Sequence, residues 1–275
     1  MADLNGKLGA NASTYGWYAQ VSSSSWSGSQ LLEVKDDVVA SGAVFQPAVM
    51  PTGGFSQITS DVALQIATVL QEFTDAGVEV WLRFGHEMNY YVTTGTYSGT
   101  ADEFVSAWKV VHDAVSSNSK IAMFWSPNNV GENQDASGLD PWFPGPDYVD
   151  VVGIDCYPSS SSSTFDGCYS SFYKEFSAAY NKPFAIGETG AGDFKESWLK
   201  QLVSQDASTY PNYVAASWFE YDKEADFRIV ETDDTTLSET KATLLSGSGT
   251  GSGGSSSTTT SSAPASTSTS ACTWG

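Results

Sequence analysis

The chain has 275 residues, 13% of them aromatic, and its 32 acidic and 12 basic side chains give a net charge of −20. The acidic groups are scattered along the chain, which argues against nucleic acid and anionic membranes as partners. No apolar run is long enough to span a bilayer, and the residues after Met1 (ADLNGKLG) lack the basic and apolar regions of a signal peptide.

Predicted helices and strands alternate along most of the chain. The predicted strands span residues 14–21, 43–50, 78–84, 120–125, 149–157, 183–188 and 213–221. The predicted helices span residues 4–10, 30–39, 61–76, 101–116, 170–180 and 195–206. This rhythm predicts a parallel sheet covered by helices, as in a (β/α)8 TIM barrel. A doubly wound open sheet is the alternative, but its usual GxGxxG and GxxxxGK[ST] loops are missing from the sequence.

The strand count falls one short of a closed barrel, because seven strands are predicted where eight are needed. The first strand is the one we expect to be missing, since the predicted helix at residues 4–10 would then follow a truncated strand. Such a barrel has a gap or an unpaired edge.

The C-terminal residues differ in composition from the rest. Residues 246–270 are almost entirely Gly, Ser, Thr, Ala and Pro, which predicts a disordered linker of the kind found in secreted proteins. Residues 271–275 contain Cys272 and Trp274, and we interpret them as the start of a truncated module. The remaining residues, 1–245, suit one α/β domain.

Two predicted strands end in a glutamate. The stretch VEVWLRFGHEMNY, residues 78–90, alternates as a strand and then reaches His86 and Glu87, and PFAIGE ends at Glu188. A barrel places its active site at these strand ends, and two carboxylates there can cleave a glycosidic bond. A single strand-end glutamate more often forms a surface salt bridge, so the interpretation depends on the pair.

Other polar and aromatic residues favour the same site. Arg83 points to the same side of its strand as Glu87, and it either supplies positive charge inside the barrel or pairs with a core acid such as Asp155. Several aromatic residues lie at strand ends, where flat rings pack well on sugars, although core packing is the alternative for each: Trp17, Tyr18, Trp125, Tyr157, Trp218 and Phe219.

The cysteines and histidines limit the remaining chemistry. Cys156, Cys168 and Cys272 are odd in number, so either Cys156 and Cys168 form a disulfide or Cys156 is a small buried side chain. With two histidines and no HExxH, a metal site lacks ligands, and we expect neither metal nor cofactor. A GxSxG nucleophile elbow is also missing.

Three motifs resemble glycoside hydrolase family 26, whose members are (β/α)8 retaining glycosidases best known as endo-β-1,4-mannanases. They are RFGHEMN at residues 83–89, VGIDCY at 152–157 and IGETG at 186–190, and the resemblance to the fungal type spans roughly residues 14–230. In that family the two glutamates belong to the fourth and seventh strands. This numbering agrees with the strand count only if one strand precedes Thr14.

The resemblance implies a role for each motif residue. Glu87 corresponds to the general acid/base and Glu188 to the nucleophile. It also implies that Tyr157 hydrogen-bonds Glu188 and that Trp218 is a platform beneath the sugar at the cleavage point. His86 would contact substrate or hold the surroundings of the nucleophile in place.

We therefore expect a secreted, monomeric, retaining endo-glycosidase that cuts a cell-wall polysaccharide, β-1,4-mannan first, by double displacement. Secretion is inferred from the linker and the resemblance. Residues 90–93 (YYVT) replace the WxxW segment that often follows this motif in mannanases. β-1,3- or mixed-linkage glucan and xylan therefore remain alternative substrates, and a non-catalytic carbohydrate-binding barrel is an alternative function.

Overall fold

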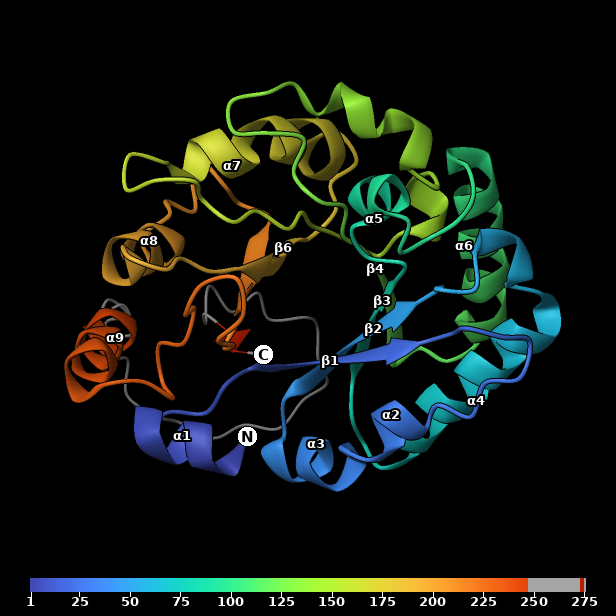
Figure 1. Ribbon diagram of the computed structural model, residues 1–275, viewed down its shortest axis with the longest axis horizontal. Helices are drawn as coiled ribbons and strands as arrows, with labels where there is room; N and C mark the ends of the chain where they lie inside the picture. The colour runs from blue at the N-terminus through green and yellow to red at the C-terminus, as the bar shows by residue number, and fades with distance from the viewer. Residues whose placement is uncertain (247–272, 275) are drawn as a thin grey trace, which may run out of the picture.

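The computed structural model describes residues 1–246 and 273–274, and its strands form one parallel sheet in chain order. The first seven strands curl into the wall of a barrel (Figure 1). They are β1 (Thr14–Gln20), β2 (Val44–Met50), β3 (Val80–Phe84), β4 (Ile121–Trp125), β5 (Val151–Val152), β6 (Phe184–Thr189) and β7 (Tyr213–Trp218). The short strand β8 (Thr273–Trp274) pairs in parallel with the end of β7.

Helices surround the sheet on its outer side (Figure 1). The α-helices are α1 (Ala2–Leu8), α2 (Ser29–Leu32), α3 (Lys35–Ser41), α4 (Ser60–Asp75), α5 (Met88–Thr94), α6 (Ala101–Val115), α7 (Phe165–Phe172), α8 (Lys195–Val203) and α9 (Asp234–Ser246). Three 3-10 helices, η1 (Phe55–Gln57), η2 (Ala136–Trp142) and η3 (Pro146–Tyr148), and a π-helical segment, η4 (Tyr173–Ala178), complete them.

The helices pack through apolar residues at helical spacing. In α4 the buried positions include Val62, Ile66 and Phe73, and the Thr59 side chain caps the first turn by accepting from the Val62 amide. In α6 a capping box between Thr100 and Glu103 sets the start of the helix. Burial of these stripes against the strands forms one continuous core.

The seven predicted strands are all present, and the fold agrees with a (β/α)8 barrel that lacks a strand. Within the described residues, β1 pairs with β2 alone. Its other edge faces an opening toward β7, which is partly filled by β8, paired with β7 and in contact with β1. The Thr14 and Ser217 hydroxyl oxygens lie 3.3 Å apart across this opening.

The predicted strand at residues 149–157 is wrong in its length, because β5 is regular only at Val151–Val152. Gly153 follows, at a position where a Cβ would lie 1.9 Å from the Ala185 carbonyl oxygen. The chain continues along the wall through separate bonds, including Asp155 N–H to the Pro127 carbonyl at 2.9 Å. The polar residues that follow β5 therefore still face the barrel.

Helix prediction differs from the structure in several places. The single helix predicted at residues 30–39 is divided into α2 and α3, and the one predicted at 170–180 continues from α7 as the π-helical η4. Helix α7 begins at Phe165 rather than at residue 170, because the Thr164 side chain caps it. Sequence analysis also missed α5 and α9, whose sequences are rich in Thr, a weak helix former. The predicted linker lies outside the described residues apart from Ser246, and Thr273–Trp274 are the only described part of 271–275. Within the described part of the chain, none of the helices is long and apolar enough to cross a bilayer.

Candidate active site

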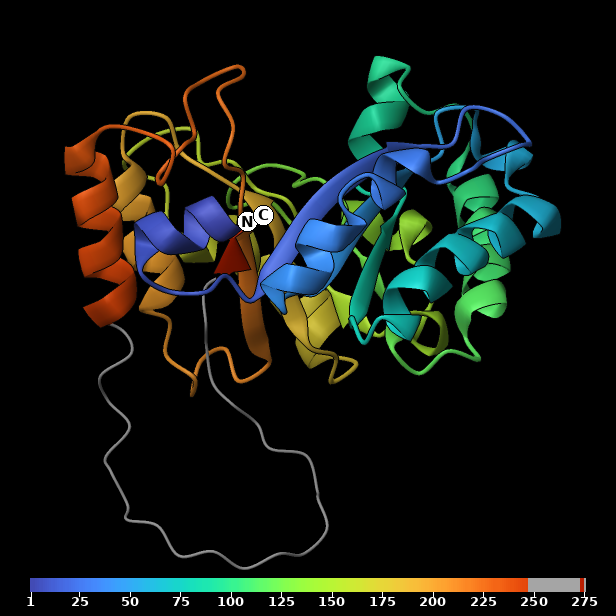
Figure 2. The ribbon, with the colours of Figure 1, turned by 90° about the horizontal axis from the view of Figure 1, so that it is seen from below.

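A cleft of about 860 Å³ opens at the C-terminal ends of the strands. Helix α5 and the loop after β7, residues 219–227, rise on the same side of the molecule and wall the cleft (Figure 2). Its lining residues include both predicted glutamates and several aromatic rings: Tyr18, Glu87, Tyr90, Tyr91, Tyr157, Glu188, Phe219, Tyr221 and Phe227. This is the rim at which the sequence predicted the site.

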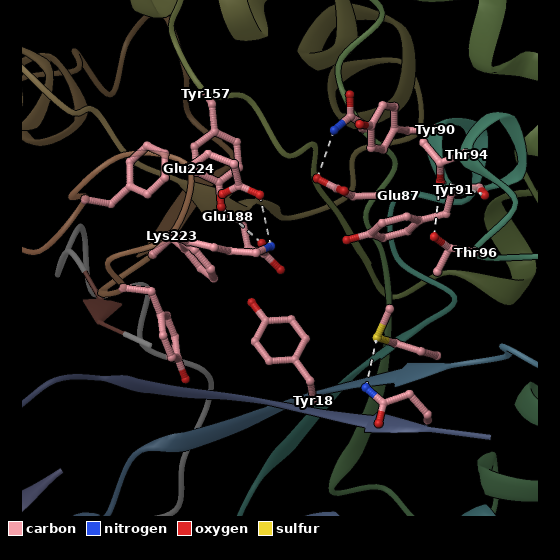
Figure 3. Close-up of a pocket in the computed structure, with 16 residues that line it drawn as sticks. Tyr18, Glu87, Tyr90, Tyr91, Thr94, Thr96, Tyr157, Glu188, Lys223 and Glu224 are labelled. Carbon is pink, nitrogen blue, oxygen red and sulfur yellow. Dashed lines mark hydrogen bonds and ion pairs between the residues drawn. The ribbon is translucent and has the colours of Figure 1, made fainter. Parts of the chain in front are cut away.

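Glu87 and Glu188 face one another across this cleft (Figure 3). Glu188 belongs to β6, whereas Glu87 lies in a tight turn after β3, where Gly85 and Glu87 have φ angles of 56° and 51°. The Glu87 amide donates to the Ser126 carbonyl oxygen at 2.8 Å, which fixes that turn against β4. One carboxylate oxygen from each of Glu87, Asp155 and Glu188 lies within 4.8 Å of the others.

Glu188 is held as an anion by donors on both of its oxygens. The Arg83 Nη1 donates to Oε1 at 2.7 Å, and the Tyr157 hydroxyl donates to Oε2 at 3.1 Å. Burial opposes the charged form, but the positive charge of Arg83 and hydrogen bonds from Arg83 and Tyr18 outweigh it. The pKa of Glu188 therefore lies below its ordinary value.

Glu87 has the opposite tendency. Burial raises its pKa to about 7, and the negative charge of Glu188 contributes in the same direction. The Asn128 side chain donates to Glu87 Oε1 at 2.9 Å, and Asn128 is itself oriented by two hydrogen bonds with Asn89. Glu87 can thus keep its proton at a pH at which Glu188 is ionised.

Arg83 combines the two roles that the sequence left open. It is 3% exposed, pairs with Asp155 as well as Glu188, and donates to the Ser126 hydroxyl at 2.7 Å. The planar guanidinium can satisfy these partners at once because its five donors form a rigid fork. Burial and the negative charge of Glu188 raise the pKa of Asp155, while the positive charge of Arg83 opposes that rise.

The three carboxylates of this cluster, Glu87, Asp155 and Glu188, are the one group of candidate metal ligands in the described residues. They do not fit a metal ion well, because Arg83 already places a cation on Asp155 and Glu188. Positive charge in this site therefore comes from the chain itself.

His86 lies beneath the cleft rather than on its wall. It is 1% exposed, its Nε2 is 3.7 Å from Glu188 Oε1, and its ring packs between Tyr18 and Tyr91. Burial and the Arg83 charge lower the pKa of His86 to about 3, so its imidazole is neutral at neutral pH. Of its two expected roles, the geometry favours support of the surroundings of Glu188.

The two predicted tryptophans lie elsewhere. Trp125 does not line the cleft, because its fully buried ring packs against Phe143, Phe172 and Phe176, so its assignment to substrate is wrong. Trp218 is 2% exposed and lines a small interior pocket below Glu188, where its indole N–H donates to the Phe227 carbonyl. Its ring is therefore not an open platform in this structure.

Cys156 and Cys168 form a disulfide, which excludes the alternative of a free buried Cys156. Sequence analysis missed Tyr18 and Tyr91 as partners of the glutamates, and it missed the Asn89–Asn128 pair. Asn128 had a usable signal, since it closely follows β4 in the polar segment SPNN. Tyr18 was noticed only as one of several strand-end aromatics that suit a carbohydrate cleft, and nothing in the sequence connected it to Glu188.

A barrel that presents an ionised and a protonated carboxyl group in an aromatic cleft has the design of a glycoside hydrolase. The model of glycosyl hydrolase family 26 matches residues 46–234, and the chain belongs to this family. The resemblance of the three motifs to family 26 is thereby confirmed.

Relatives by sequence include endoglucanase H of Acetivibrio thermocellus, 30% identical over 182 residues, which are 60% of this chain and 20% of that protein. A mannan endo-1,4-beta-mannosidase of Bacillus subtilis is 32% identical over 155 residues, which are 51% of this chain and 40% of that protein. The matches therefore span less than half the length of either relative.

Solved structures show the same fold. A family 26 β-mannanase from Bacteroides ovatus aligns with a TM-score of 0.60 and 13% identity over 90% of this chain and 82% of that chain. A modular endo-β-1,4-mannanase from Cellulomonas fimi aligns with a TM-score of 0.62 and 17% identity over 88% of this chain and 65% of that chain. The predicted TIM-barrel class is confirmed.

Proposed function

We propose that this chain is a retaining endo-β-glycosidase that hydrolyses a β-linked cell-wall polysaccharide. The observation that carries the proposal is the opposed ionisation of Glu87 and Glu188 at close range. One oxygen of each lies within 4.8 Å of the other, a close approach that suits the roughly 5–5.5 Å between the carboxyl groups of retaining enzymes.

In the proposed reaction Glu188 attacks the anomeric carbon while Glu87 protonates the departing oxygen. Arg83 and Tyr157 hold the attacking carboxylate in its charged form, and the pKa of Glu87 near 7 supplies the proton. Glu87 then takes a proton from water, which displaces the sugar from Glu188. Acid catalysis and attack thus use two groups that the protein keeps in different protonation states.

β-1,4-Mannan is our first candidate substrate. Two of the curated relatives are named as mannan endo-1,4-beta-mannosidases, and family 26 β-mannanases share the fold. Glucan is the second candidate, because another relative is named endoglucanase H. Half-exposed Tyr90 and Tyr221 on opposite walls of the cleft suit the apolar faces of sugars on either side of the reacting bond.

We also propose that the protein works outside the cell. The Cys156–Cys168 disulfide supports this location, since such bonds persist mainly in oxidising compartments. The Ser/Thr-rich composition of residues 246–270 supports it as well.

The test is release of reducing ends from β-1,4-mannan, glucomannan, β-1,3-glucan, mixed-linkage glucan and xylan. We expect the wild type to degrade one polymer class and Glu188→Ala to lose at least about 10³-fold of that rate. Glu196→Gln is the control, because it alters an exposed carboxylate on α8 away from the cleft and should retain activity. Proton NMR of the first product should show a β anomer.

Two outcomes would contradict the proposed function. A first product of α configuration would rule out double displacement. Folded protein that is retained on a polymer without cutting it would make this chain a carbohydrate-binding barrel.

A further inference from the structure

The disulfide lies next to a residue that contacts the nucleophile. Cys156 is 1% exposed and directly precedes Tyr157, whose hydroxyl donates to Glu188 Oε2 at 3.1 Å. This inference rests on the proposed function in one respect, since it takes Glu188 as the nucleophile.

Tyr157 lies beyond the regular part of its strand. The ladder of β5 ends at Val152, and the exposed residues 159–162 follow soon after Tyr157. Tyr157 is therefore one of the last residues before the chain leaves the barrel wall. Its place depends on how firmly the residue before it is anchored.

Cys156 is anchored from two sides. Toward β6, its amide donates to the Glu188 carbonyl at 3.2 Å, and its carbonyl accepts from the Thr189 hydroxyl at 2.6 Å. Toward the outer layer, its sulfur is bonded to Cys168 of α7. Helix α7 is itself fixed in the core by Phe165, Tyr169 and Phe172, all buried.

The disulfide thus supplies a covalent support where the strand ladder has ended. We propose that the Cys156–Cys168 bond is a positioning device for catalysis: it holds the end of β5 so that the Tyr157 hydroxyl stays on Glu188. Cys156 and Cys168 act here through Tyr157 and do not contact the substrate.

The alternative is that the disulfide only stabilises the fold, since closing a short loop restricts the unfolded chain. The two hypotheses predict different effects on the pKa of Glu188. Loss of a donor to a carboxylate raises its pKa, whereas general destabilisation leaves the native pKa unchanged. The other titratable groups facing Glu188 come from β1, β3, α5 and the segments after β3, β5 and β7: Tyr18, Arg83, His86, Glu87, Tyr91, Asp155 and Tyr221.

The first experiment compares the wild type with Cys156→Ala/Cys168→Ala on the polymer that the wild type cuts. We expect at least a tenfold loss of kcat/KM and a shift of the acid limb of its pH profile to higher pH, because Glu188 must be ionised to attack. Tyr157→Phe should cause the same two changes in the wild type but less than a twofold further loss in the double variant. Phe73→Leu, a core change in α4, controls for lost stability.

A second readout does not need activity. The Glu188 carboxyl carbon is titrated by ¹³C NMR, with its signal assigned from Glu188→Gln, and its midpoint should rise in the disulfide variant. A risen midpoint in a protein that cuts no polymer would refute the proposed function and leave the positioning role standing.

An unchanged midpoint and acid limb, with a fully additive effect of Tyr157→Phe, would overturn the positioning role even if stability falls. If the double variant does not fold, Cys168→Ala decides on the same readouts, because it breaks the bond and keeps the buried Cys156 side chain.

Discussion

Glu87 and Glu188 share one cleft, yet their surroundings favour opposite protonation states. Burial without a cation partner raises the pKa of Glu87 to about 7, while contact with Arg83 keeps that of Glu188 low. A bell-shaped pH dependence of kcat/KM follows, with Glu188 on the acid limb and Glu87 on the basic limb. Activity should therefore fall as pH rises through about 7.

Asn128 gives a test of the basic limb. Its side chain donates to Glu87 and so favours the ionised form of that carboxyl group. We expect Asn128→Ala to raise the pKa of Glu87 and to move the basic limb of kcat/KM to higher pH. Thr96→Ser is the control, since Thr96 lines the same cleft and its hydroxyl contacts Thr94. A limb that stays in place or moves down would contradict this assignment.

Arg83 holds two buried carboxylates, so its loss should destabilise the fold as well as the site. We expect Arg83→Met to lower the free energy of unfolding by about 3–5 kcal/mol, because it leaves buried negative charge without a partner. Urea denaturation measures the change. Adding Asp155→Asn should restore part of the loss.

The exposed pair of Lys200 and Glu196 gives the matched comparison for Arg83. Lys200→Met should change stability by less than about 1 kcal/mol, as expected for a surface ion pair. Similar losses in the two variants would mean that the buried pairing contributes little.

At the scale of elements, the ends of the strands place the chemistry more than their regular parts do. Strand β3 delivers Arg83 within its ladder, but Glu87 reaches the cleft only through a left-handed turn, and Tyr157 follows an irregular continuation of β5. A non-glycine residue with positive φ is uncommon and often marks a functional site. That conformation cannot be predicted from the sequence, although GHE after a strand indicates a turn there.

Gly153 tests the close packing behind β5. A Cβ there would lie 1.9 Å from the Ala185 carbonyl, so we expect Gly153→Ala to force β5 and β6 apart and to cost at least about 3 kcal/mol. Gly6→Ala in α1 is the control, since nothing lies within 4 Å of its Cβ position and alanine favours helix. Thermal unfolding compares the two. Equal melting temperatures would show that β5 and β6 can separate enough to accept the added Cβ at little cost in stability.

At the scale of the whole molecule, the sequence predicted the architecture and the two glutamates because both follow from local patterns. The periodicity of strands and helices, and acidic residues at strand ends, can be recognised in the sequence without knowledge of the fold. Contacts between distant segments cannot be read in this way, which is why Trp125 was assigned to the cleft and the contact of Tyr18 with Glu188 was not predicted. Arg83 is an intermediate case. The alternation of its strand predicted that its side chain faces the site, but it did not predict that Arg83 contacts Glu188 and Ser126 at once.

The net charge of −20 should oppose the compact state through repulsion among the acidic groups. We expect the melting temperature at pH 7 to rise by a few degrees between roughly 10 and 150 mM NaCl, as the Debye length falls to about 8 Å. The same series near pH 4.1, the isoelectric point of the sequence, is the control and should show little change. A melting temperature that falls with salt at pH 7 would mean that attractive ion pairs dominate.

The edge of β1 that pairs with no described strand has a consequence for the centre of the barrel. Tyr18 belongs to this edge strand, whereas Glu188 belongs to β6 on the far side of the opening, and the two meet in the site (Figure 3). Any widening of the ring between β1 and β7 would draw Tyr18 away from Glu188. The surroundings of Glu188 therefore depend on the distance between β1 and β7, so the stiffness of that junction affects the candidate active site.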